Sequence, residues 1–243
     1  MKASKRILAS GLISAVAISY ASAGTYVSEG VYGNPFETIS GASATSIWSD
    51  VSESVHSTGF SSWPGSSAWS ATMPPNSSSG TSTDIEVARV SGSGSTFLDG
   101  GPYPSDDTVY FGGLRISDNT GGVLEVAEVD PVAGLSEVVF QIQLGEGNGD
   151  DFTPSTPPVL TYTTSSGTYT ATLSSGSISS PVDTFENGTY SNGEYDVDET
   201  VILNEYKFVW DLSGVTGTIL SFEVQWSQVM HSQLYGLQVD QKN

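Results

Sequence analysis

The sequence predicts an all-β protein, an antiparallel β-sandwich with little helix. Short stretches of alternating polar and apolar residues recur along the chain, and Gly, Pro and Asn turn signals separate them. No repeat of fixed period is present, which disfavours a propeller or a β-helix. A jelly roll is the form we expect. With 243 residues, of which 37% are hydrophobic, the chain is long enough to bury a sizeable core.

The first residues have the pattern of an export signal. Lys2, Lys5 and Arg6 precede an apolar stretch that ends near Ile18, and Ala21-Ser22-Ala23 fits a cleavage site before Gly24. We therefore expect a signal peptide over residues 1–23 and a single β-sandwich domain over residues 24–243 of a secreted protein. An uncleaved N-terminal anchor is the alternative.

Residues 24–83 form a segment rich in Ser, Gly and Trp that we expect to pack on the sandwich. Ala44, Ile47, Trp48, Val51 and Val55 are spaced as on one face of a helix, which predicts one short helix. Because Ser and Thr suit strands and turns as well, a strand in this segment stays an alternative.

Strands are predicted from residue 84 onward, wherever alternation or a short apolar run is bounded by turns. About eight to ten strands fit the spacing, and the hairpin 159–173 turns at Ser165-Ser166-Gly167. In the stretch 219–226, Leu220, Phe222, Val224 and Trp226 share one predicted face. We assign Trp210 and Trp226 to the core. The predicted strands span 84–90, 108–116, 123–129, 138–144, 159–163, 168–173, 201–203, 206–210, 219–226 and 233–240.

The composition excludes several classes of protein. Seven basic and 27 acidic side chains give a formal net charge of -20, which disfavours binding to nucleic acid. The absence of cysteine excludes disulfide scaffolds and cysteine-ligated metals. A negative field repels anionic polysaccharides unless calcium bridges the two, so neutral glycans are the expected carbohydrate partners.

Three tryptophans are candidates for a binding surface. Trp48, Trp63 and Trp69 lie in a segment with few other large apolar residues. Exposed indole rings can stack on sugar rings, which predicts a carbohydrate platform. The alternative is that these rings close one end of the core, since Trp is usually largely buried.

Acidic turns are candidates for structural calcium sites. Glu146, Asn148, Asp150 and Asp151 place oxygen ligands close together in a Gly-rich loop, as calcium requires. Asp196, Asp198 and Glu199 form a second candidate, and Glu29 with Asp240 a third if the first and last strands lie together. Solvated acidic turns are the alternative.

Few residues point to catalysis. His56 and His231 are the only histidines, and neither has carboxylates at metal-ligand spacing; we expect His231 to be a structural hydrogen-bonding residue. No Gly-x-Ser-x-Gly elbow stands between a predicted strand and a helix. No spacing singles out a pair of carboxylates for glycoside hydrolysis. No catalytic residue is therefore assigned.

Four short stretches carry a resemblance to a family. They are 58–65 (TGFSSWPG), 138–147, 210–215 (WDLSGV) and, most distinctive, 231–241 (HSQLYGLQVDQ). They resemble bacterial secreted β-sandwich proteins of the PEP-CTERM-associated type. The resemblance implies an exported β-sandwich and no known catalytic residues. Because no Pro-Glu-Pro signal with an apolar helix and a basic end follows, free secretion is expected rather than anchoring.

Three functions are compatible with these observations. The first is a non-enzymatic secreted protein of the bacterial cell surface or extracellular matrix, with glycans as its candidate ligands. The second is a secreted polysaccharide-active enzyme, a jelly-roll glycosidase or lyase. The third is a self-associating structural matrix protein. The shortage of Arg, Lys and His disfavours a lyase, which needs a base or a cation near its substrate's carboxylate.

Overall fold

The computed structural model describes residues 36–52, 55–56, 72–81, 84–92, 101–104, 108–112, 121–147, 152, 156–178, 183–191 and 196–243. The chain divides into two compact units. The smaller comprises Met1–Tyr26 and Phe185–Thr200, and holds most of β11 (Asp183–Ser191) and the first residues of β12 (Asp196–Asp211), which pair with each other. The larger unit comprises Val27–Thr184 and Val201–Asn243 and contains the sandwich.

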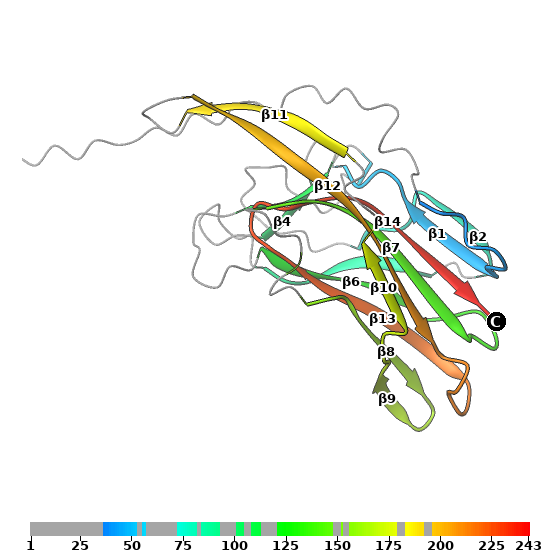
Figure 1. Cartoon of the computed structure of the whole chain (residues 1–243). Coiled ribbons are helices and arrows are strands. Elements are labelled where there is room, and N and C mark those ends of the chain that lie inside the picture. Colours follow the sequence, from blue (N-terminus) through cyan, green and yellow to red (C-terminus); the bar gives the residue numbers. More distant parts are fainter. Residues whose placement is uncertain are drawn as a thin grey trace, which may run out of the picture. The chain divides into compact units, whose positions relative to one another are not determined.

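The larger sheet has the order β10-β12-β7-β14-β1-β2 (Figure 1). At its centre β7 and β14 pair antiparallel over almost their whole length, from Gln233↔Gly145 to Lys242↔Glu137. β5 also pairs with β14, and β4 pairs with β5. The strands are β1 (Ala44–Trp48), β2 (Ser77–Gly80), β4 (Gly101–Pro104), β5 (Val109–Gly112), β7 (Glu137–Gly145), β10 (Ser175–Ile178) and β14 (Gln233–Lys242).

The smaller sheet has five strands in the order β3-β6-β13-β8-β9. Its central strand, β13, pairs antiparallel with β6 on one side and β8 on the other. The strands are β3 (Glu86–Ser91), β6 (Gly122–Glu128), β8 (Val159–Thr164), β9 (Gly167–Thr170) and β13 (Ile219–Gln228).

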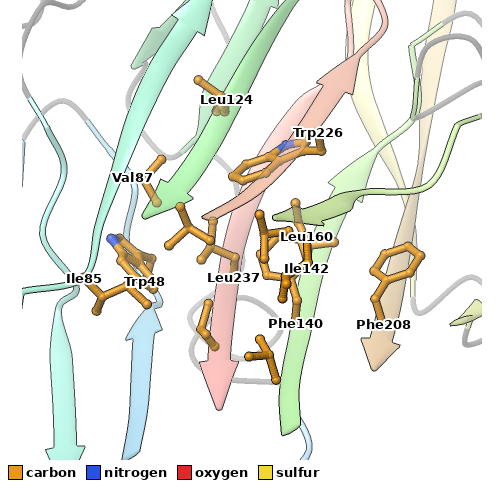
Figure 2. Packing of buried hydrophobic residues seen from close by; sticks show 14 of the residues in the cluster. Trp48, Ile85, Val87, Leu124, Phe140, Ile142, Leu160, Phe208, Trp226 and Leu237 are labelled. Atoms are coloured by element: carbon orange, nitrogen blue, oxygen red, sulfur yellow. The ribbon is translucent and has the colours of Figure 1, made fainter. Parts of the chain in front are cut away.

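The two sheets pack face to face through one core, as the sequence predicts for a sandwich. Inward residues of both sheets meet there; the rings of Phe140 on β7 and Trp226 on β13 lie 5.3 Å apart (Figure 2). Trp210 and Trp226 are buried, as predicted. The all-β sandwich is therefore confirmed, whereas the narrower expectation of a jelly roll stays a prediction.

The predicted helix near residue 48 is wrong. Residues Ala44–Trp48 form β1, in which Ala44, Ser46 and Trp48 are buried and the residues between them are half-buried. The burial therefore repeats every two residues, as in a strand. Pairing with β14 on one side and β2 on the other overrides the helix-like spacing.

Two further details differ from the sequence-based expectation. Leu220 is 50% exposed because the register of β13 against β8 shifts between Ile219 and Ser221, so Ile219 and not Leu220 packs inward. The stretches 201–203 and 206–210 belong to one long strand, β12. The described part of the chain holds 14 strands, more than expected. β2, β4, β10 and β11 were not predicted, and β1 was predicted only as the alternative to a helix.

Trp48 links the two sheets through a hydrogen bond. Its Nε1 donates to the Met73 carbonyl at 2.8 Å, and Met73 forms a β-bridge with Val87 at the edge of the smaller sheet. The ring is fully buried beside Ile85, Val87 and Leu237 (Figure 2). The indole therefore contributes both apolar burial and a directional contact across the core.

Trp48→Phe is expected to lower the free energy of unfolding by about 2 kcal/mol, because it removes a buried hydrogen bond and leaves a small void. Urea unfolding followed by circular dichroism measures this change. Leu220→Ala is the control and should change stability by less than about 0.5 kcal/mol, since that side chain is exposed. An unchanged stability in Trp48→Phe would contradict the structural role of the indole.

Candidate functional site

The outward side of the larger sheet is covered by the segment Phe36–Ser40. We call this side the covered face. The Gln141 side chain on β7 holds the segment, because its Oε1 accepts from the Glu37 amide and its Nε2 donates to the Glu37 carbonyl, both at 2.9 Å. Gln238 Nε2 on β14 lies 3.3 Å from the same carbonyl. The two glutamines thus bind the main chain of Glu37 as a neighbouring strand would.

The covering makes the polar residues of this face part of the interior. Gln141 and Gln238 are almost completely buried, and Asp240 is 1% exposed. At the margin Lys207 Nζ pairs with Glu37 Oε2 at 2.7 Å, which adds an ion pair to the same segment. Gly236 on β14 allows the Trp48 carbonyl of β1 to approach closely, since a Cβ at this position would lie 2.7 Å from that oxygen. The covered face is therefore closed to a large ligand.

Asp240 is the most buried acidic group of the covered face. Its oxygens accept from Thr45 Oγ1 at 2.6 Å and Gln238 Nε2 at 2.8 Å, and Gln141 Nε2 lies 3.4 Å away. Burial raises the pKa of Asp240, while these hydrogen bonds and the charge of Lys242 oppose the shift. Burial also raises the pKa of Glu205, and the charge of Glu37 adds to that effect.

No residue in the described part of the chain covers the outward side of the smaller sheet in this way, and we call this side the open face. It is defined by Glu125 on β6, Thr161 on β8, and Glu223 and Gln225 on β13, all half-buried. Gln225 Nε2 donates to Glu125 Oε2 at 2.9 Å and lies 3.4 Å from Glu223 Oε1. Thr161 Oγ1 donates to Glu223 Oε1 at 2.9 Å. Mutual hydrogen bonds thus hold hydroxyl, amide and carboxylate groups in fixed positions.

Apolar side chains alternate with these polar ones across the open face. In the strand register Val159 lies opposite Gln225, and Ala127 lies opposite both Glu223 and Glu86. Val159 is 40% exposed. The open face is therefore a mixture of hydrogen-bonding and apolar groups, which suits a ligand with both kinds of surface.

The predicted tryptophan platform loses one of its members. Trp48 has no exposed surface, and its indole N–H donates to the Met73 carbonyl. Its ring therefore cannot stack on a sugar. The assignment of Trp48 to a ligand-binding surface was wrong, because the strand period turns it into the core. Trp63 and Trp69 lie outside the described residues, and their role stays a prediction.

The predicted calcium ligands are placed only in part. Glu146 is half-buried and accepts a hydrogen bond from Asn204 Nδ2 at 2.9 Å, whereas Asn148, Asp150 and Asp151 lie outside the described residues. The same holds for Glu29 and for the side chains of Asp196, Asp198 and Glu199. Among the side chains that are described, no group of three or more His, Asp or Glu is arranged to hold a metal ion. Calcium binding stays a prediction.

Both histidines make hydrogen bonds. His56 Nε2 lies 3.0 Å from the Asp50 carbonyl, and burial lowers the pKa of His56. The Nδ1 atom of His231 lies 2.6 Å from the Tyr110 hydroxyl. The backbone of His231 has a positive φ of 73° and forms the turn before β14. His231 is therefore a hydrogen-bonding residue of a tight turn, as expected from the sequence.

The basic side chains are partners of nearby groups. Besides Lys207 with Glu37, Lys242 pairs with Glu137 at 2.7 Å. Arg89 Nη1 donates to the Gly92 carbonyl at 2.6 Å. Arg115 lies outside the described residues.

Comparison with known protein families, with curated proteins and with solved structures finds no match. In the part of the chain that the structure describes, no helix has the length and apolar character needed to cross a membrane. The open face therefore has to be interpreted from its own chemistry.

Asp240→Asn is expected to change how stability depends on pH. The folded pKa of Asp240 is raised above the unfolded value of 3.8, so the folded state binds more protons in this range. The wild type therefore loses stability as pH rises from 3.8 through the raised pKa, and the variant lacks this loss. The free energy of unfolding of the variant minus that of the wild type should then increase with pH over this range.

Denaturant titrations at several pH values measure this difference. Glu205 contributes a slope of the same sign to both proteins and cancels in the subtraction. The charges of Glu37, Lys207 and Lys242 are also common to both. A difference that stays constant with pH would contradict the raised pKa of Asp240.

Proposed function

We propose that this protein is a non-enzymatic, secreted β-sandwich protein of the bacterial cell surface or extracellular matrix, and that its open face binds neutral glycans. The observation that carries the proposal is the linked set Glu125, Gln225, Glu223 and Thr161, which lies on a sheet face that no described residue covers. The export pattern of residues 1–23 supports the compartment.

Sugar hydroxyls both donate and accept hydrogen bonds, as the groups of the open face do. A carboxylate accepts a hydrogen bond from a sugar hydroxyl. A side-chain amide or a threonine hydroxyl can either donate a hydrogen bond to the sugar hydroxyl or accept one from it. The side chains are already held by each other, so little conformational entropy is lost when a ligand binds. The apolar C–H side of a sugar ring can pack on Val159, which is exposed beside Gln225.

The charge of the open face favours neutral over anionic polymers. Glu86, Glu125 and Glu223 lie on the adjacent strands β3, β6 and β13, within a protein whose formal net charge is -20. Such a field repels polyanions and leaves uncharged glycans unaffected. A face that extends over several adjacent strands also suits a polymer, which can contact more than one strand at a time.

The second candidate is a glycosidase, and one specific observation favours it. Glu125 Oε2 and Glu223 Oε1 both contact Gln225 Nε2, at 2.9 and 3.4 Å. The two oxygens are therefore at most about 6.3 Å apart, which is compatible with the separation of about 5–5.5 Å between the carboxyl groups of retaining glycosidases. The burial expected of a general acid is lacking, because the side chains of Glu125 and Glu223 are both half-exposed.

Binding to an array of neutral and anionic polysaccharides tests the proposal, with released reducing ends measured in parallel. We expect binding to one or more neutral glycans without release of reducing ends. No binding to any neutral glycan would overturn it. Release of reducing ends that Glu223→Gln abolishes would replace it with the glycosidase.

Gln225→Leu is expected to weaken binding of the preferred oligosaccharide by about tenfold, because the variant loses an amide that can contact the ligand and frees the two carboxylates it holds. Isothermal titration calorimetry measures the affinity. Thr38→Val, at an exposed position in the segment Phe36–Ser40 on the larger sheet, is the control and should bind as the wild type does. Equal affinity in Gln225→Leu would exclude the open face as the binding surface.

A further inference from the structure

One edge of the smaller sheet is unprotected. β9 is the outermost strand, next to β8, and all four of its residues are exposed. Natural sheets usually protect such an edge with charges, proline or a bulge. β3, at the opposite edge, has Glu86 and Arg89 and a register shift between Arg89 and Ser91. β9, with the sequence Gly-Thr-Tyr-Thr, has none of these features.

The main-chain groups at this edge are directed outward at alternate residues. The register pairs Tyr169 with Tyr162, and the Ala171 amide donates to the Leu160 carbonyl at 2.9 Å. In an antiparallel ladder the residues that bond to one neighbour alternate with those that face the other side. The N–H and C=O groups of Thr168 and Thr170 therefore face away from β8, where a further strand would pair.

The lack of charged residues around β9 favours a second copy of this chain as the partner. No residue between Asp151 and Asp183 is charged, although the chain as a whole has a formal net charge of -20. Two copies of so acidic a chain repel each other over most of their surface, and this neutral hairpin is where they can approach at the least electrostatic cost. A two-fold contact also uses the same edge from both copies.

The exposed tyrosine of β9 sets the register of such a contact. Tyr169 is 45% exposed and stacks on Tyr162 with a ring separation of 5.6 Å. Pairing that places Tyr169 opposite Tyr169 of the second copy brings Thr168 opposite Thr170 of that copy. The outward main-chain groups of those threonines then bond to each other, and the two tyrosines form a cross-strand aromatic pair.

We propose that β9 is a self-association edge, through which two copies of this protein pair antiparallel and join their smaller sheets into one continuous sheet. The proposal does not rest on glycan binding. It would place two open faces on one assembly, which increases avidity for a repeating polymer.

Sedimentation velocity over a range of concentrations tests the pairing. The wild type should show a dimer whose fraction rises with concentration. Thr168→Glu with Thr170→Glu, and separately Thr168→Lys with Thr170→Lys, should each raise the dissociation constant at least tenfold, because like charges then face each other. An equimolar mixture of the two variants should restore the dimer. A monomeric wild type, or variants that dimerise as the wild type does, would overturn the proposal.

A single introduced cysteine tests the register independently, because the chain has no cysteine of its own. Tyr169→Cys should form a disulfide-linked dimer on mild oxidation, since residues paired directly across antiparallel strands lie within disulfide distance. Val129→Cys is the control, at a position that is 64% exposed and outside this edge. Equal cross-linking of both variants, or none in Tyr169→Cys, would rule out this register. Circular dichroism verifies that each variant is folded.

Discussion

The hydrogen bonds between the Gln141 side chain and the main chain of Glu37 decide which parts of this sandwich are interior and which are surface. They fix the segment Phe36–Ser40 across the larger sheet, where it excludes water from the polar residues of β7 and β14. Buried polar groups have to find partners within the protein. Thr45, Gln238 and Asp240 do so with one another. The two central strands of the larger sheet, β7 and β14, are thus buried on both faces, whereas no described residue covers the outward side of the smaller sheet.

The difference between the two outward faces is the basis for the functional interpretation. Both faces carry amides, hydroxyls and carboxylates, and in both these groups are hydrogen-bonded to neighbours. On the covered face these groups bind the segment Phe36–Ser40 and one another. On the open face the same chemistry, around Gln225, remains accessible to a partner from outside. The covered face already binds a polar segment of the protein through these groups. The open face carries the same kinds of group in hydrogen-bonded positions, so it is suited to bind a polar ligand.

The sequence predicted the regular strands well and the faces poorly. Alternation identified β3, β6, β8, β13 and β14, because each has one side in the core and turn residues at its ends. The alternation could not show that Gln238 and Asp240 are buried. A strand has a polar residue at every second position whether its polar side faces solvent or is covered by another segment of the chain. Trp48 was misjudged for a related reason: short segments rich in Ser fit several periods, and only pairing with β14 selects the strand. The glutamines of adjacent central strands, uncharged and in register, were the available signal for the covered face.

The place of β14 in the larger sheet has a consequence for how the protein is made. β14 follows every other described strand along the chain, yet it lies between β7 and β1, and Ala44 pairs with Gln241. The centre of that sheet therefore cannot assemble before the last strand has emerged, and its long-range pairing makes folding slow. Before β14 is available, nothing joins β7 to β1, because β14 is the strand that lies between them. β14 is therefore the strand that makes one sheet of two groups of strands, β10-β12-β7 and β1-β2, which come from distant parts of the chain.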